Sequence, residues 1–439
     1  MKDLEKLSAM LQEIDDLLSH CMKCGLCQAV CPVFKETQLE SDVTRGKLYM
    51  LEGLARHLIS DAKGVKERLD KCLLCGTCVV NCPSGVSALE IFVLARAILT
   101  EFLGLSPMKK AIFRGLVAHP RLFNSILDLS KRFQGLFIKP ANPKMGTYCS
   151  AALSSFIGNR HFMPLAKTPL HARRRKPSNI KEASRKKVVF FPGCVVDKIY
   201  PHVGETALEV LEQYQVQTVV PEMQACCGIP ALASGDTRSF ERLFHQNMDL
   251  FVRAEANYLL TPCATCTSTI KKIWPMMVKD LNLGRNEEVE RLANTTMDIS
   301  EFMVDVLRVS PPALSPGGKV TRVTYHDPCH LGKSLGVVSQ PRDLLKSNRN
   351  IELVEMAEAN VCCGNGGSFN LQHYQTSTAI GKRKCDHVIA TGAEIVATSC
   401  PACMMQLTDL LSQKQQAIAV KHVIEVFAEN ASSIPSDID

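Results

Sequence analysis

The sequence predicts a multidomain α+β chain, with a mainly helical N-terminal module followed by two tandem α/β repeats rich in cysteine. Three observations predict this organisation. The chain of 439 residues holds 20 cysteines, a compact four-cysteine motif occurs twice near the N-terminus, and a five-cysteine pattern occurs twice in the C-terminal half. A chain of this length suits about three folding units of roughly 100 to 200 residues each. Hydrophobic residues make up 46% and charged residues 22%, which excludes a mostly disordered chain.

The N-terminal sequence indicates the redox state of the cysteines. It reads MKDLEKLSAMLQEIDDLL, an acidic amphipathic start without the apolar core and cleavage site of a secretory signal. We therefore expect a cytoplasmic protein whose thiols stay reduced. The most apolar long stretch, residues 86–105, contains Glu90, Arg96 and Glu101, so we expect no transmembrane segment. Peripheral contact with the inner face of the cytoplasmic membrane stays open.

The net charge of +7 is concentrated in one segment. Residues 167–187 contain nine Lys or Arg and a single Glu, a local charge of +8, so the rest of the chain is nearly neutral. No aromatic residue interrupts this segment, which argues against nucleic-acid binding. We interpret it as a solvated linker between domains, with contact to an anionic lipid or an acidic partner as the alternative.

The predicted N-terminal domain, residues 1–100, contains both copies of the motif Cys-x2-Cys-x2-Cys-x3-Cys-Pro. Helical spacing predicts helices at 44–57 and 65–71 between the copies. Residues 101–187 are predicted to form a helical segment and then a Pro-rich basic linker, because Pro140, Pro143 and Gly146 interrupt the helical pattern. We interpret this linker as a hinge between the two halves of the chain.

From residue 188 onward, short apolar runs alternate with helical patterns, which predicts parallel sheets. The predicted domains are 188–310 and 318–430. Strands are expected at 188–191, 216–220, 258–260, 320–325, 351–355 and 395–398, and helices at 204–214, 237–256, near 342 and at 374–390. Matching cysteines in the two domains lie 135 to 137 residues apart, which indicates a tandem duplication.

The N-terminal motifs have the spacing of cluster ligands in two-cluster ferredoxins, where the fourth cysteine of each motif ligates the other cluster. Applied to this sequence, one [4Fe-4S] cluster takes Cys21, Cys24, Cys27 and Cys82, and the other takes Cys72, Cys75, Cys78 and Cys31. The alternatives are zinc or free thiols. Structural zinc prefers two well-separated Cys-x2-Cys pairs, so iron-sulfur is favoured. Gly25 and Gly76 lie inside the loops, where backbone amides approach sulfur.

Each C-terminal repeat contributes five cysteines, which we call a pentad. The first pentad is Cys194, Cys226, Cys227, Cys263 and Cys266, and the second is Cys329, Cys362, Cys363, Cys400 and Cys403. Several of these cysteines follow predicted strands, so each pentad should converge at the carboxyl edge of its sheet. Five thiolates exceed the needs of one cubane. An expanded cluster, a cubane with a spare thiol, a disulfide-exchanging site and zinc all stay open.

At these motifs the sequence resembles the iron-sulfur subunits of glycolate oxidase and lactate dehydrogenase, with wider kinship to heterodisulfide reductase and anaerobic glycerol-3-phosphate dehydrogenase subunits. The resemblance covers residues 21–425. Its segments include both N-terminal motifs, Arg45-Gly46-Lys47, Phe191-Pro192-Gly193-Cys194, His326-Asp327-Pro328-Cys329-His330-Leu331-Gly332, and the two Cys-Cys-Gly triplets after which such repeats are called CCG domains.

The resemblance implies an oxidoreductase subunit with two [4Fe-4S] clusters and, at the pentads, one or two further noncubane [4Fe-4S] clusters. Its partners would be an FAD-containing 2-hydroxy-acid dehydrogenase subunit and an acceptor such as quinone, electron-transfer flavoprotein or a membrane complex. The alternative is a catalytic subunit that reduces a disulfide at a noncubane cluster. No GxGxxG follows a strand, so we expect no flavin or NAD site in this chain, and we assign no catalytic residue.

Several residues lie outside these patterns. We expect Cys149 and Cys385 to be spare thiols. His326 and His330 flank Cys329, and we expect them to satisfy local backbone groups, with hydrogen bonds to cluster sulfur or proton transfer as the alternative. We expect the basic residues of the second repeat to form a solvated face, with steering of an anionic partner as the alternative; they are Lys333, Lys382, Arg383 and Lys384.

Overall fold

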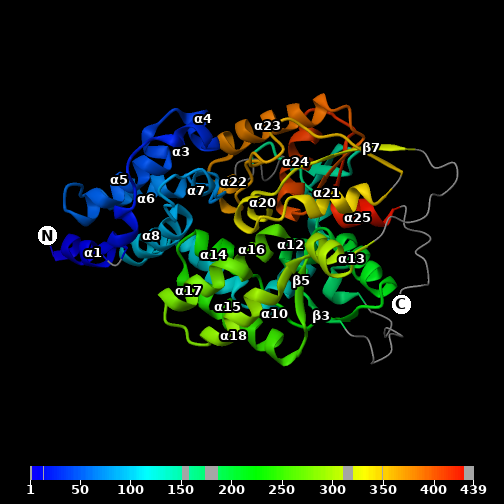
Figure 1. Cartoon of the computed structure of the whole chain (residues 1–439), viewed down its shortest axis with the longest axis horizontal. Helices are drawn as coiled ribbons and strands as arrows, with labels where there is room; N and C mark the ends of the chain where they lie inside the picture. Colours follow the sequence, from blue (N-terminus) through cyan, green and yellow to red (C-terminus); the bar gives the residue numbers. More distant parts are fainter. Residues whose placement is uncertain are drawn as a thin grey trace. The chain divides into compact units, whose positions relative to one another are not determined.

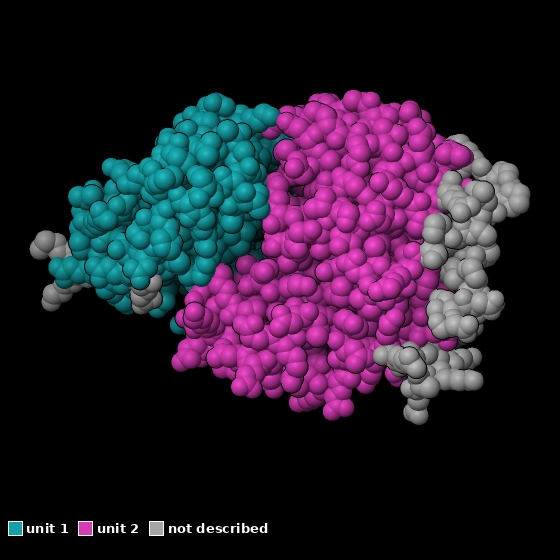
Figure 2. All heavy atoms as spheres, viewed as in Figure 1, with its two compact units in different colours: residues 1–119, 228–243, 364–381 teal, residues 120–227, 244–363, 382–439 magenta. Residues whose placement is uncertain are grey.

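The structure is a computed structural model that describes residues 2–12, 14–150, 158–173, 186–309, 320–348 and 350–429. Figure 1 labels the helices and strands along the chain. The chain divides into two compact units (Figure 2). Unit 1 comprises residues 1–119, 228–243 and 364–381, and unit 2 comprises residues 120–227, 244–363 and 382–439. Both units join segments that are distant in sequence. The predicted fold class, a helical module followed by two α/β repeats, is confirmed.

Unit 1 is helical. Its N-terminal elements are α1 (Lys2–Gln12), α2 (Asp15–Ser19), α3 (Leu26–Val30), α4 (Pro32–Thr37), η1 (Glu40–Asp42), α5 (Thr44–Ala55), α6 (Ala62–Asp70), α7 (Thr77–Val80), α8 (Ala88–Leu103), α9 (Pro107–Lys110) and η2 (Ala111–Val117). The later segments add α14 (Ile229–Ala233), α22 (Ser368–Gln372) and the first turns of α15 (Thr237–Arg253) and α23 (Tyr374–Ala390).

The core of unit 1 lies between α1, α5, α6 and α8. On α8 the buried residues Ala88, Ile91, Phe92, Ala95 and Leu99 recur at helical spacing, so one face of the helix is apolar throughout. This packing supports the two cysteine loops. Each loop ends in a left-handed glycine that starts a short helix, Gly25 (φ 87°) before α3 and Gly76 (φ 71°) before α7.

Unit 2 contains two four-stranded parallel sheets. One has the order β4-β3-β5-β6 and the other the order β10-β9-β7-β8. The strands are β3 (Lys187–Phe190), β4 (Gln217–Val219), β5 (Tyr258–Thr261), β6 (Thr296–Asp298), β7 (Thr321–Tyr325), β8 (Ile351–Leu353), β9 (Ile395–Thr398) and β10 (Ala419–His422). Since β3, β4, β5 and β6 correspond to β7, β8, β9 and β10, the two sheets have the same topology, as a duplication requires.

The helices of unit 2 cover both sheets. They are α10 (Pro120–Phe137), η3 (Leu170–Ala172), α12 (Gly193–Lys198), α13 (Pro201–Gln213), α16 (Ala264–Ser268), η4 (Thr269–Ile273), α17 (Trp274–Asp280), α18 (Asn286–Thr295), α19 (Ile299–Glu301), η5 (Phe302–Val306), α20 (Cys329–Leu335), α21 (Ser339–Lys346), α24 (Pro401–Gln413) and α25 (Val423–Ala428), with the remainder of α15 and α23. One apolar core is shared by both repeats and includes Phe190, Leu260, Val323, Tyr325 and Phe427.

The connector between the N-terminal module and the repeats is ordered over the residues that the structure describes. Strands β1 (Lys139–Asn142) and β2 (Thr147–Cys149) form a hairpin whose Asn142 and Thr147 bond to the Gln416 carbonyl and the Ser412 hydroxyl, at 3.2 and 2.6 Å. The hairpin thus packs on the second repeat. Most of the predicted basic linker, residues 174–185, lies outside the described residues.

Strands β1, β2, β6 and β10 were not predicted. Of these, β6 and β10 are short and carry polar residues that the fold buries, such as Thr296, Asp298 and His422. Within the described ranges, no helix combines the length and apolar character needed to span a bilayer.

Candidate metal centres

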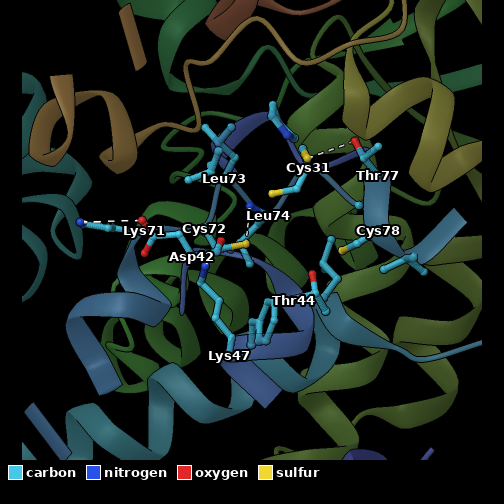
Figure 3. Close-up of a pocket in the computed structure, with 17 residues that line it drawn as sticks. Cys31, Asp42, Thr44, Lys47, Lys71, Cys72, Leu73, Leu74, Thr77 and Cys78 are labelled. Atoms are coloured by element: carbon cyan, nitrogen blue, oxygen red, sulfur yellow. Dashed lines mark hydrogen bonds and ion pairs between the residues drawn. The ribbon is translucent and has the colours of Figure 1, made fainter. Parts of the chain in front are cut away.

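A pocket of unit 1 brings one cysteine of the first motif together with three of the second. Its lining includes Cys31, Cys72, Cys75 and Cys78. Figure 3 shows the sulfur atoms of Cys31, Cys72 and Cys78 directed toward one space. Backbone amides approach these sulfurs: Phe34 N lies 3.5 Å from Cys31 Sγ and Leu74 N lies 3.4 Å from Cys72 Sγ. We call this the second-motif pocket.

A neighbouring pocket of unit 1 has the complementary composition, and we call it the first-motif pocket. Its lining includes Cys21, Cys24, Cys27 and Cys82. The amide of Val86 lies 3.5 Å from Cys82 Sγ. Cys78 and Thr44 line both pockets, so the two sites are adjacent. The structure therefore groups the fourth cysteine of each motif with the first three of the other, as crossed ligation requires, while the ligand assignment itself stays our prediction.

Helix α5 supplies a different cation to each pocket. Arg45 lines the first-motif pocket, where its positive charge acts on Cys27 and Cys24. Lys47 lines the second-motif pocket and acts on Cys72 and Cys31. Gly46 lies between them with its Cα so close to the Glu40 carbonyl that a Cβ would come within 2.0 Å of the oxygen. The segment Arg45-Gly46-Lys47 thus packs α5 against η1 and places one charge at each site.

The two cations differ in exposure. The Lys47 residue is 1% exposed, its ammonium donates to the Asp42 carbonyl oxygen, and burial lowers its pKa. The Arg45 side chain is 31% exposed and pairs with Glu40 at 2.7 Å. Because water screens exposed charges, Lys47 acts on its pocket more strongly than Arg45 does. Sequence reasoning assigned no role to either residue, although both lie midway between the cysteine motifs.

Three thiols of unit 1 are poor anions without a metal. Burial raises the pKa of Cys27 and Cys31, and it raises that of Cys78 to about 12. A metal ion or cluster supplies the positive charge that makes such buried thiolates favourable. Four thiols per pocket, amides aimed at sulfur and a nearby cation together fit a [4Fe-4S] cluster.

The first pentad assembles where the strands of its sheet end. Cys194 follows β3 at the start of α12, and Cys263 follows β5 as the N-cap residue of α16. Cys226 contacts Cys194, and Cys227 contacts Cys266. Asn247 holds the intervening loop, because its side chain accepts from Ala225 N at 2.8 Å and donates to the Cys226 carbonyl at 3.0 Å.

The second pentad has the same framework. Cys329 begins α20 after β7, Cys400 caps α24 after β9, and Cys363 contacts Cys403. Cys362, Cys363, Cys400 and Cys403 are buried. The predicted convergence of pentad cysteines at the carboxyl edges of the sheets is thus seen in both repeats.

The two pentads meet within unit 2. Cys263 donates a hydrogen bond to Cys400, which lowers the pKa of the Cys400 thiol, and Thr265 lies 3.5 Å from the same sulfur. A backbone hydrogen bond links the two repeats at the same place, because Ala264 N donates to the Ser399 carbonyl at 3.1 Å. Sequence comparison of the repeats could not reveal this contact, because it depends on how their sheets pack.

The two histidines that flank Cys329 are held differently. His330 bonds to Thr265 at 3.1 Å, whereas the fully buried His326 has the Ala359 carbonyl acting on its ring, with neither ring nitrogen in full hydrogen-bond geometry. The expected role of His326 stays a prediction. The expectation for Lys384 was wrong, because Lys384 does not belong to a solvated face. It is 2% exposed, it donates to the carbonyls of Glu358 and Ala359, and burial lowers its pKa to about 8. Both His326 and Lys384 lie beside the second pentad.

The remaining thiols lie away from these centres. Cys385 is buried in the apolar cluster around α23 and α24, where burial raises its pKa to about 12. Cys149 ends β2. Neither of them lines a pocket of unit 1. Their predicted role as spare thiols stays a prediction.

Comparisons with known proteins match the same segments. Residues 17–86 match a 4Fe-4S dicluster domain, and residues 188–271 and 323–408 each match a cysteine-rich domain. A crystal structure of a hypothetical protein from Helicobacter pylori is similar with a TM-score of 0.50 and 11% identity, covering 98% of this chain and 77% of that chain. This likeness concerns the fold alone.

Curated relatives match nearly the whole chain or about half of it. The chain is 28% identical to the probable glycolate oxidase iron-sulfur subunit of Bacillus subtilis over 94% of each chain. It is 27% identical to a subunit of the fumarate reductase (CoM/CoB) of Methanothermobacter marburgensis, over 93% of this chain and 71% of the relative. It is 32% identical to lactate utilization protein A of Halalkalibacterium halodurans, over 55% of this chain and 96% of the relative.

The dicluster match falls on the eight cysteines of the two pockets. The chain is therefore a two-[4Fe-4S] protein with two further cysteine-rich domains. It belongs to the family of iron-sulfur oxidoreductase subunits that includes lactate utilization protein A and the glycolate oxidase iron-sulfur subunit.

Proposed function

We propose that this chain is the electron-transfer subunit of a flavin-dependent 2-hydroxy-acid dehydrogenase complex. It takes electrons from an FAD-containing subunit that oxidises glycolate or lactate and passes them to an acceptor such as quinone. Relatives named as a glycolate oxidase subunit and as a lactate utilization protein support this substrate class. The observation that carries the proposal is the adjacency of the two four-cysteine pockets, which share Cys78 and Thr44.

We assign the ligands by the grouping of the pockets. Cys21, Cys24, Cys27 and Cys82 hold one cluster, Cys72, Cys75, Cys78 and Cys31 hold the other, and the pentads hold further centres. Bound clusters supply one-electron redox chemistry. The protein contributes thiolate ligands, the amides of Phe34, Leu74 and Val86 directed at sulfur, and the charges of Arg45 and Lys47. Of these groups, the amides and the two cations favour the reduced, more negative state of each site, whereas the thiolates favour the oxidised state.

The test uses the full chain, prepared without oxygen together with its co-purifying partners. We expect an FAD protein to co-purify, and we expect glycolate or lactate to bleach the visible absorption of the clusters only when that protein is present. Cys24→Ser should slow or abolish this reduction, because it removes an assigned ligand. Cys385→Ser, at a buried thiol outside the pockets and pentads, should leave it unchanged. Cluster reduction by neither acid in the presence of the FAD protein would contradict the proposal.

A second function is favoured by the junction of the pentads. Ten cysteines of two complete pentads lie in unit 2, and Cys263 bonds to Cys400 across them. Such a site suits a disulfide substrate, which takes up two electrons and two protons as its S–S bond breaks into two thiols. Reoxidation of the dithionite-reduced chain by a small disulfide, at a rate that Cys263→Ser lowers, would favour this function. Reoxidation by quinone analogues alone would favour electron transfer.

A further inference from the structure

The two cysteine-rich repeats carry different residues at two equivalent positions beside their pentads. Three residues before the first cysteine of each pentad, the first repeat has Phe191 and the second has His326. On the long helices α15 and α23, which have 17 residues each and start 137 residues apart, Asn247 corresponds to Lys384. The second pentad therefore has an imidazole and an ammonium where the first has a phenyl ring and an amide.

His326 has the position of a metal ligand. A ligating atom of its ring and the sulfur atoms of Cys363 and Cys403 all lie within 4.8 Å of one another. All three residues are buried, and both ring nitrogens of His326 are shielded from water without a hydrogen bond. The Ala359 carbonyl acts on the ring, but the same oxygen already accepts from Asp327 N at 3.1 Å and from Lys384 Nζ at 3.3 Å. A buried imidazole with at most this one shared partner is costly, and a metal ion would satisfy it.

In the first repeat, Phe191 occupies the position equivalent to His326 and packs as an apolar side chain. It is fully buried and packs edge-to-face against Phe251 with ring centroids 5.5 Å apart. An apolar side chain thus fills the position in this fold, so packing alone does not require a histidine in the second repeat. The charge of Lys384 acts on Cys363 and Cys362, whereas Asn247 bonds to the backbone of the cysteine loop.

We propose that the second pentad holds an iron centre to which His326 contributes a nitrogen ligand beside Cys363 and Cys403, whereas the first pentad binds through thiolates only. Tetrahedral sites of thiolate and imidazole suit iron-sulfur centres as well as zinc, and the iron-sulfur family of this chain favours iron. Replacing a thiolate by a neutral imidazole removes one negative charge from a centre, which raises its reduction potential. If the proposed electron-transfer function holds, electrons would collect at the second pentad; the ligand assignment does not depend on that function.

The test is pulsed EPR on the full chain, prepared without oxygen and with its metal content measured. We expect strong nitrogen hyperfine coupling that changes when histidine is labelled with ¹⁵N and disappears in His326→Phe, the residue of the first repeat. His330→Ala is the matched control, since His330 flanks the same pentad and bonds to Thr265, and it should retain the coupling. His326→Cys should keep the iron, lose the coupling and lower the midpoint potential of one centre.

Three results would overturn the proposal. The first is no nitrogen coupling in the wild-type chain, including the case in which the chain holds only the eight irons of two cubanes. The second is coupling that survives in both His326→Phe and His326→Cys. The third is one zinc per chain that either variant releases, because it would assign the imidazole–thiolate site to zinc. Since none of these measurements uses a hydroxy acid or an acceptor, their outcome is independent of the proposed function.

Discussion

Lys47→Met tests whether a buried charge sets the potential of one N-terminal cluster. Lys47 is 1% exposed and lines the same pocket as Cys31, Cys72 and Cys78. Coulomb's law gives about 2 kcal/mol for two unit charges about 8 Å apart at an effective dielectric constant of about 20. For a one-electron couple this corresponds to about 90 mV. Methionine keeps the length of the side chain and removes its charge, so one midpoint potential should fall by about 90 mV.

The assay is an anaerobic potentiometric titration followed by EPR, with iron content measured to show that the clusters are retained. Arg45→Met is the matched control, because Arg45 lies on the same helix beside the other pocket and its side chain is 31% exposed. Solvent screening should make its shift smaller, and the shift should affect the other cluster. Unchanged midpoints in Lys47→Met, or equal shifts of the same cluster in both variants, would refute the assignment of Lys47 to the second-motif pocket.

Three further predictions concern ligation, packing and pH. Cys31→Ser should damage the cluster built on Cys72, Cys75 and Cys78 while the other cluster keeps four cysteines; EPR loss confined to the first-motif cluster would contradict crossed ligation. Arg96→Leu should lower the stability of unit 1 by about 3 kcal/mol, because buried Arg96 donates to the carbonyls of Leu69, Cys72 and Ala233. Thermal unfolding measures this loss of stability. Arg56→Leu is the control, because Arg56 forms an exposed ion pair and its replacement should cost about 0.5 kcal/mol or less. Equal losses of stability in the two variants would count against the buried network around Arg96. Burial raises the pKa of Glu425 to about 7, so the folded chain keeps a proton that the unfolded chain releases, and stability should fall as pH rises from about 4.5 to about 7. Glu425→Gln preserves the acceptor for His422 N. In denaturant titrations, its free energy of unfolding should exceed that of the wild type by up to about 3 kcal/mol at pH 8 but by little at pH 4. If the variant differs from the wild type by the same amount at both pH values, Glu425 does not titrate in this way.

The cysteine spacings determined which metal chemistry this chain performs, because a ligand set is encoded by residue type and by short distances along the chain. Periodicity also determined the strands that precede Cys194, Cys263 and Cys400. It missed β6 and β10, where burial of Thr296 and His422 depends on neighbouring strands rather than on an apolar pattern.

Tertiary structure decided which cysteines share a pocket and which other groups reach them. The approach of Lys47 to one pocket and Arg45 to the other follows from the packing of α5 against η1, and the contact between Cys263 and Cys400 follows from the packing of two sheets on one core. The sequence likewise did not predict the burial of Lys384 and His326. A cationic run such as the one that contains Lys384 is typical of an exposed face, and a histidine next to a strand is typical of a locally bonded position. The physical reason is that desolvation and charge interactions depend on distances through space, and residues distant along the chain set those distances.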